Sequence, residues 1–258
     1  RIYHAFVAGG EAVISNQDYL NKINVFPVPD ADTGTNLAST MRSIMEGSRV
    51  YQSLKETFRS IADSALLGAR GNSGIIFAQF IHGLSQEINS SRQIQAQTFA
   101  KSVKKAIDYV YDSIMEPVEG TMITVMRDWV QAIETHSQKS TDFFHILHES
   151  LQVARQSLKD TPRKLKVLAD AGVVDAGANG FVNFLEGIVN FMHRGNLKKL
   201  VPDLNFPEEA PAHTSFQELL SDHRYCTEAI ITDCALDLPG LRQRIKDYGD
   251  SLIVVGSP

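Results

Sequence analysis

The stretch Asn24-Val-Phe-Pro-Val-Pro-Asp30-Ala-Asp32-Thr-Gly-Thr-Asn36 places two carboxylates two residues apart, directly before a glycine that opens a helical pattern. Pro27 and Pro29 fix their own φ angles and keep the preceding residues out of the helical region, so an extended approach is expected. Asp30 and Asp32 are hard oxygen ligands of the kind that Mg²⁺ uses together with water and phosphate oxygens. The stretch therefore predicts a metal-bridged phosphate site. A Pro-Asp-Gly turn with a helix N-cap is the alternative that the same residue types allow.

Gly34, Thr35 and Asn36 follow the two acids where the helical pattern begins. Backbone N–H groups at a helix N-terminus, with short polar side chains beside them, favour an anion. We expect a phosphate group to bind there.

The composition of the 258 residues is that of an ordinary soluble protein, with 43% hydrophobic and 21% charged residues. No apolar run has the length of a membrane span and the N-terminus lacks a signal-peptide pattern, so we expect a cytoplasmic protein without a membrane segment. The net charge of -5 argues against a nucleic-acid partner. Cys226 and Cys234 both lie late in the chain and provide no disulfide framework for most of the fold.

Helical periodicity dominates up to about residue 194, with short polar breaks and no convincing strand. About eight amphipathic helices are expected, at roughly 3–22, 35–47, 51–68, 73–88, 99–114, 121–136, 144–158 and 178–193. Residues 1–194 are therefore expected to form one helical domain.

The remainder of the chain has a different composition. Prolines and scattered acids over 195–222 are typical of a linker. Residues 223–258 are expected to begin a small α/β domain that the chain does not complete, with strands at 227–232 and 251–255 and a helix at 238–248. Such a piece buries too little surface to be stable alone.

Three further glycine-rich junctions interrupt the helices with residue types that a core does not require. They are Gly68-Ala-Arg-Gly-Asn-Ser-Gly74, Pro117-Val-Glu-Gly-Thr-Met122 and Asp170-Ala-Gly-Val-Val-Asp-Ala-Gly-Ala-Asn-Gly180. Each junction alone also fits a helix connection, in which Ser73 or Thr121 would serve as an N-cap. Together with the first stretch they indicate one shared ligand site at one end of a helix bundle.

The order of these four motifs resembles the ATP-binding domain of dihydroxyacetone kinases and, more closely, the catalytic subunit of bacterial fatty acid kinases. The resemblance extends to the end of the chain, because Tyr225-Cys-Thr-Glu228 and Gly249-Asp-Ser-Leu252 are similar to the opening of the middle domain of that subunit. It implies an all-α fold, an antiparallel barrel of eight helices, with Mg²⁺ and the ATP phosphates held by the loops at one end.

Carried over residue by residue, the resemblance implies that Asp30 and Asp32 are catalytic metal ligands, with Asn24 in the place of a third ligand. It implies nucleotide contacts for Thr33, Gly34, Thr35, Asn36, Asn72, Ser73, Gly74, Thr121, Met122, Asp175, Gly177 and Ala178. The chain departs from the family pattern at two places. Ala31 stands where the family usually has glycine, so a positive φ there would carry a steric penalty, and Ala178-Asn179 replaces what is often Gly-Gly.

The function implied by the resemblance is ATP- and Mg²⁺-dependent transfer of a phosphoryl group to the carboxylate of a fatty acid, giving an acyl phosphate. The acid would be presented by a separate carrier protein, and relatives suggest a homodimer. Cys226 matches a zinc ligand of the middle domain, but no histidine follows His223, so a buried thiol is the simpler interpretation. Two alternatives stay open: a dihydroxyacetone kinase-like subunit that relays phosphate, and a regulatory module that binds nucleotide without turnover.

Overall fold

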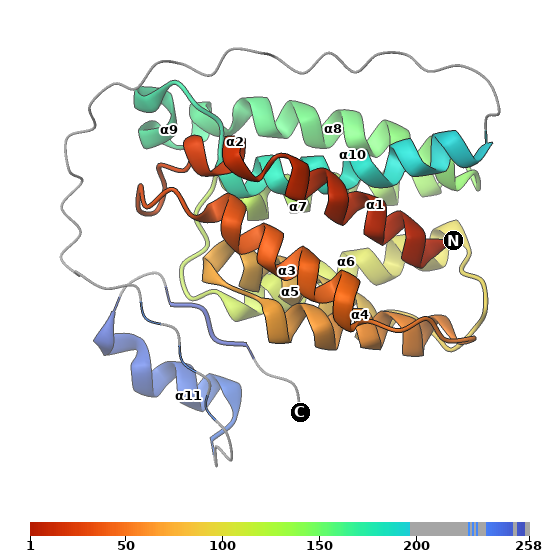
Figure 1. Cartoon of the computed structure of the whole chain (residues 1–258), viewed down its shortest axis with the longest axis horizontal. Helices are drawn as coiled ribbons and strands as arrows, with labels where there is room; N and C mark the ends of the chain where they lie inside the picture. Colours follow the sequence, from red (N-terminus) through yellow and green to blue (C-terminus); the bar gives the residue numbers. More distant parts are fainter. Residues whose placement is uncertain (197–226, 228, 230, 232–235, 250–251, 256–258) are drawn as a thin grey trace.

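The computed structural model describes residues 1–196, 227, 229, 231, 236–249 and 252–255 (Figure 1). The described part contains eleven α-helices and one short 3₁₀ helix, η1. They are α1 (Ile2–Ser15), α2 (Gln17–Lys22), α3 (Thr33–Gly47), α4 (Leu54–Gly68), α5 (Gly71–Glu87), α6 (Ala96–Ser113), α7 (Met122–Ser137), α8 (Phe143–Lys164), α9 (Lys166–Ala171), α10 (Ala176–Asn196), α11 (Leu238–Ile245) and η1 (Lys246–Tyr248).

Eight of these helices form a closed ring. Each helix in the series α1, α3, α4, α5, α6, α7, α8, α10 packs against the next, and α10 packs back against α1. Neighbours in the ring run in opposite directions (Figure 1). The predicted all-α antiparallel barrel of eight helices is therefore confirmed.

The interior of the ring is filled by the apolar faces that the periodicity predicts. On α6, for example, Val103, Ala106 and Val110 have no exposed surface. Aromatic rings meet edge to face in the centre, with the centroids of Phe77 and Phe184 4.9 Å apart and those of Trp129 and Phe181 5.7 Å apart. This packed core holds the ends of the helices in fixed positions.

Two short helices differ from the sequence prediction. The expected helix 3–22 is divided at Asn16, whose side-chain Nδ2 donates to the carbonyl of Ala12 at 2.8 Å, so that α2 leaves in a new direction. The six-residue α9 was not expected, and it ends at Gly172 with a left-handed φ of 66°. Hydrophobic periodicity cannot identify helices of fewer than two turns.

The expected helix 238–248 is present as α11 followed by η1, and Asp237 caps it by accepting from the N–H of Gly240 at 2.8 Å. The described residues of the two expected strands are not in a strand. Ile253 instead forms an isolated antiparallel bridge with Ile114, which follows α6. The expected linker 195–222 and Cys226 lie outside the described residues, apart from the last two residues of α10.

Among the residues that the structure describes, none of the helices combines the length and the apolar character that crossing a membrane requires.

Candidate functional site

The four predicted motifs come together because α3, α5, α7 and α10 all begin at the same end of the barrel (Figure 1, left). Contacts between their first turns prove this placement. A Cβ atom at Gly71 would lie 2.2 Å from Nδ2 of Asn36, and one at Gly180 would lie 2.3 Å from Cδ1 of Leu37. A Cβ at Gly177 would lie in ordinary contact with Met122, 3.4 Å from its Cβ. The barrel thus presents four helix N-termini at one end, an arrangement that attracts anions.

Asp30 and Asp32 lie side by side at the entrance to α3. Loss of solvent around the Asp30 carboxyl raises its pKa, and the charge of Asp32 and a hydrogen bond between the two side chains raise it further. Asp32 occupies the N-cap position of α3, but its carboxylate makes no capping hydrogen bond. The capping alternative is therefore wrong for this side chain. Two adjacent carboxylates that are not used by the helix have the donor chemistry that fits a divalent cation.

Asn24 is buried, and its side chain holds Asp30. Its Nδ2 donates to Oδ1 of Asp30 at 2.9 Å and to the carbonyl of Val28 at 2.8 Å, and its Oδ1 accepts from the hydroxyl of Thr33. With these bonds Asn24 orients Asp30, whereas its own role as a metal ligand stays a prediction. Among the described residues, this stretch included, no three or more His, Cys, Asp or Glu side chains form a cluster that could hold a metal, so the acid pair offers two carboxylates and no third.

In the segment Thr33–Asn36, which was predicted to bind phosphate, some of the polar groups are hydrogen-bonded within the protein. The N–H of Thr35 donates to Oδ1 of Asn21 at 3.0 Å, and its hydroxyl accepts from Nδ2 of the same residue at 3.0 Å, so Thr35 faces α2. The N–H of Asn36 enters the helix by donating to the carbonyl of Asp32 at 2.8 Å. Within the described residues, the N–H groups of Thr33 and Gly34 have no hydrogen-bond partner. The fold leaves these two donors unused, and both residues are buried.

The second junction lies directly against α3. Gly74 is buried, and a Cβ there would meet Oγ1 of Thr40 at 2.7 Å. Asn72 and Ser73 are half-buried in the first turn of α5. Because α5 begins at Gly71 with Arg70 at the N-cap position, the alternative that made Ser73 an N-cap is wrong. The guanidinium of Arg70 donates to the carbonyl of Ala69 at 2.7 Å.

The third and fourth junctions are joined by Asp175, which is buried. Its Oδ1 accepts from the N–H of Ala178 at 2.7 Å, and its carboxylate also accepts from the N–H of Met122. Burial raises the pKa of Asp175 to about 6, against the lowering effect of these two backbone bonds. Thr121 is the N-cap residue of α7, yet its hydroxyl donates to the carbonyl of Val118 at 2.8 Å and caps nothing.

The two departures from the family pattern are accommodated differently. Ala31 has a φ of 56°, the left-handed conformation that glycine adopts more easily. The steric penalty expected at this position is therefore present. Ala178 has no exposed surface and packs inside the first turn of α10, while Asn179 is half-buried.

Two residues of this end were not identified from the sequence. Asn21 engages both polar groups of Thr35, and Thr161 accepts the N–H of Asp175 at 3.1 Å through Oγ1. Asn21 lies in α2 and Thr161 in α8, and neither belongs to a sequence motif that would indicate a binding site. Only the tertiary structure brings them to the site.

Comparison with known proteins identifies the family. The model of the DAK2 domain matches residues 27–190, which include the acid pair and the three later junctions but not Asn24. This chain belongs to the DAK2 domain family. Membership of this family indicates a dihydroxyacetone kinase-like, kinase-related function. The matched residues contain the acid pair and the four helix N-termini described above.

Curated relatives of this DAK2 protein occur in staphylococci. An uncharacterized protein of Staphylococcus haemolyticus is 32% identical over 259 residues, which cover 96% of this chain and 47% of that protein. An uncharacterized protein of Staphylococcus saprophyticus has the same identity and coverage. The chain therefore spans about half the length of the curated relatives that it matches.

Solved structures of a dihydroxyacetone kinase share the fold of the DAK2 protein. The native enzyme from C. freundii aligns with a TM-score of 0.55 and 15% identity over 74% of this chain and 34% of that one. The same enzyme in complex with AMP-PNP and Mg²⁺ aligns with a TM-score of 0.54 and 15% identity over 73% and 33% of the two chains. At this identity the likeness establishes the fold alone.

Proposed function

We propose that this DAK2 protein transfers the γ-phosphoryl group of ATP to the carboxylate of a fatty acid, with Mg²⁺, and that a separate carrier protein presents the acid. The observation that carries the proposal is the pair Asp30 and Asp32 placed beside four converging helix N-termini. Phosphoryl transfer asks a protein mainly to position the reactants and to neutralise charge. Two carboxylates and free backbone donors meet that requirement.

The residues of the chain have distinct parts in this proposal. Asp30 and Asp32 would hold Mg²⁺, which would supply positive charge to the phosphate oxygens. The free N–H groups of Thr33 and Gly34 would bind phosphate oxygens at the start of α3. Asn24 keeps Asp30 oriented through its hydrogen bond to that carboxylate. The segments of Asn72 to Gly74, Thr121 to Met122 and Asp175 to Ala178 would surround the rest of the nucleotide.

The acceptor decides which further groups the reaction needs. A fatty carboxylate is an anion at neutral pH, so one of its oxygens can form the new P–O bond directly while the bond to the β-phosphate oxygen breaks and ADP leaves. No proton has to be removed, and no general base is required from the protein. A hydroxyl acceptor would have to lose a proton. The family motifs contain no histidine for that purpose, which is compatible with a carboxylate acceptor.

The test uses the purified chain with ATP, Mg²⁺ and a carrier protein loaded with a fatty acid. Acyl phosphate is trapped with hydroxylamine and ADP is measured in parallel. Asp30→Ala is expected to lower the rate at least about 100-fold, because a metal ligand is lost. Glu56→Ala removes the same charge from an exposed residue in the first turn of α4 and is expected to leave the rate unchanged.

Other outcomes favour the other functions. Nucleotide that stays bound through purification, with no acyl phosphate for any acid or carrier, favours a phosphate-relay subunit of the dihydroxyacetone kinase type. Nucleotide binding without any turnover, and partner binding that Asp30→Ala leaves intact, favours a regulatory module. We also propose that the chain forms a homodimer, and light scattering, which gives the molar mass in solution, tests this.

A further inference from the structure

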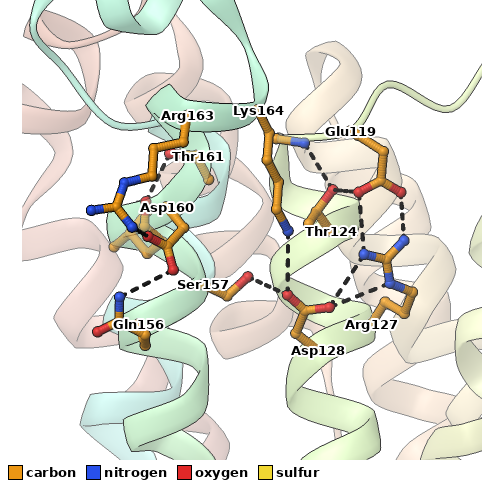
Figure 2. A network of polar contacts seen from close by, with 12 residues as sticks. Glu119, Thr124, Arg127, Asp128, Gln156, Ser157, Asp160, Thr161, Arg163 and Lys164 are labelled. Carbon is orange, nitrogen blue, oxygen red and sulfur yellow. Dashed lines mark hydrogen bonds and ion pairs between the residues drawn. The ribbon is translucent and has the colours of Figure 1, made fainter.

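A connected set of polar side chains lies beside the junction that leads into α7 (Figure 2). Arg127 donates to both carboxylate oxygens of Glu119, from Nη1 to Oε1 and from Nη2 to Oε2, the second bond being 3.1 Å long. These bonds lower the pKa of Glu119 and keep it ionised. Arg127 also donates to Oδ1 of Asp128 at 3.3 Å from Nε and from Nη2. Arg127 therefore joins the junction to the body of α7.

The backbone of the junction is held at further points by α7. The hydroxyl of Thr124 donates to Oε2 of Glu119 at 3.0 Å and accepts from the N–H of Gly120 at 2.9 Å (Figure 2). Thr124 is buried, with 1% of its surface exposed. The hydroxyl of Thr121 closes the turn on the carbonyl of Val118. Residues 118–121 thus have one defined conformation directly before Met122.

The junction is also seated on the end of α8. Oδ2 of Asp128 accepts from the hydroxyl of Ser157 at 2.6 Å and lies 3.7 Å from Nζ of Lys164. Gly120 has a φ of 86°, and a Cβ there would lie 3.0 Å from the carbonyl oxygen of Thr161. There is no space for the turn to move toward α8.

We propose that Arg127 and Glu119 are positioning residues, which fix the Thr121–Met122 segment so that the start of α7 faces Asp175 and the nucleotide. The proposal rests on the function proposed above, because it assigns a role in nucleotide binding. A guanidinium and a carboxylate joined by two bonds fix orientation as well as distance. The side chains are 31% and 56% exposed, so the pair contributes little to the stability of the whole fold. Its effect is therefore expected to be local.

The test compares Arg127→Met with Arg163→Met in the 258-residue chain. Arg163 belongs to the same region of Figure 2, but its partner is Asp160, one turn away on α8, and its side chain is 81% exposed. Calorimetry gives the Kd for AMP-PNP with Mg²⁺, and mass spectrometry gives amide exchange over residues 118–123. We expect Arg127→Met to raise the Kd about fivefold to tenfold and to speed the exchange of these amides, with little change in Tm. Arg163→Met is expected to change none of the three.

Two more variants separate positioning from a general loss of packing. Arg127→Lys keeps the charge without the paired donors, so an intermediate Kd is expected. The double variant Glu119→Gln/Arg127→Met is expected to have a Kd for AMP-PNP no higher than that of either single variant, because both changes remove the same interaction.

Either of two results would overturn the positioning role: unchanged exchange over residues 118–123 in Arg127→Met, or faster exchange with an unchanged Kd. A wild-type chain that binds no AMP-PNP with Mg²⁺ contradicts the proposed function itself. That result is visible before any variant is made, so the two failures are distinguishable.

Discussion

At the residue scale, the carboxylate of Asp175 links two helix starts that are more than fifty positions apart in the sequence. It accepts backbone hydrogen bonds from Met122 and Ala178 and is 5% exposed. Burial opposes its ionisation, and the pKa rises from 3.8 to about 6. A group whose pKa is raised on folding binds its proton more tightly in the folded state, so its contribution to stability is present at low pH and is lost as the pH rises through about 6.

Asp175→Asn is expected to remove this pH dependence while it keeps the oxygen that caps α10. The shift from 3.8 to about 6 corresponds to about 3 kcal/mol. The unfolding free energy of the variant minus that of the wild type should therefore become more positive by about this amount between about pH 3.5 and about pH 7. Urea unfolding at several pH values measures both curves. Parallel curves for the two proteins would show that Asp175 titrates normally.

At the element scale, the contact between α2 and α3 sets the direction in which α3 starts. Gly34 is buried against α2, and a Cβ there would lie 2.1 Å from the carbonyl oxygen of Gln17 and 2.8 Å from Oδ1 of Asn21. A backbone oxygen cannot move aside as a side-chain end can. The absence of a side chain at Gly34 therefore allows the first turn of α3 to lie directly beside α2.

Gly34→Ala is expected to lower the unfolding free energy by about 2 kcal/mol or more, because the added methyl group forces α2 and α3 apart. Gly10→Ala is the matched control. Gly10 lies inside α1, where a Cβ would make ordinary contacts at 3.4 Å with Met41 and Met45. The control is expected to be neutral or to stabilise the protein by up to about 1 kcal/mol, since alanine favours helix. Equal losses in the two variants would contradict the role of the close contact.

The sequence predicted the long helices well because each has one apolar face that repeats over three or more turns. The candidate site residues were predicted for a different reason: a hydrophobic core does not require adjacent acids or clustered glycines at helix starts, so their presence indicates a binding site. The residues that complete this end carry no such pattern. In the sequence Asn21 is an ordinary polar residue, and only the break of the helix at Asn16 places it against Thr35. Arg127 likewise has the sequence context of a surface cation, and its bonds to Glu119 are visible only in the structure.

At the scale of the whole molecule, the ring is closed by the contact of α1 with α10, so the first helix of the chain stabilises the last helix of the barrel. The main hydrophobic core runs from Phe6 to Val189, within residues 1–196. The described residues after α10 make backbone hydrogen bonds to the segment at the end of α6. The N–H of Val254 donates to the carbonyl of Ser113 at 3.2 Å, and the N–H of Met115 donates to the carbonyl of Leu252 at 3.5 Å. This contact lies on the segment that leads from α6 to the junction at Glu119.

A chain that ends at Asn196 is expected to keep the barrel, because the core residues are all present in it. We expect its Tm to lie within about 4 °C of that of the 258-residue chain, since two backbone bonds and the burial of Val254 are lost. The amide of Met115 is expected to exchange faster, whereas the amides of Val103 to Val110 in α6 should keep their protection. Calorimetry and hydrogen exchange on the two chains, side by side, measure both effects. A shortened chain that lacks a cooperative transition would show that the barrel needs the later segment for its own stability, and the closed ring of α1 to α10 would then not be a complete folding unit.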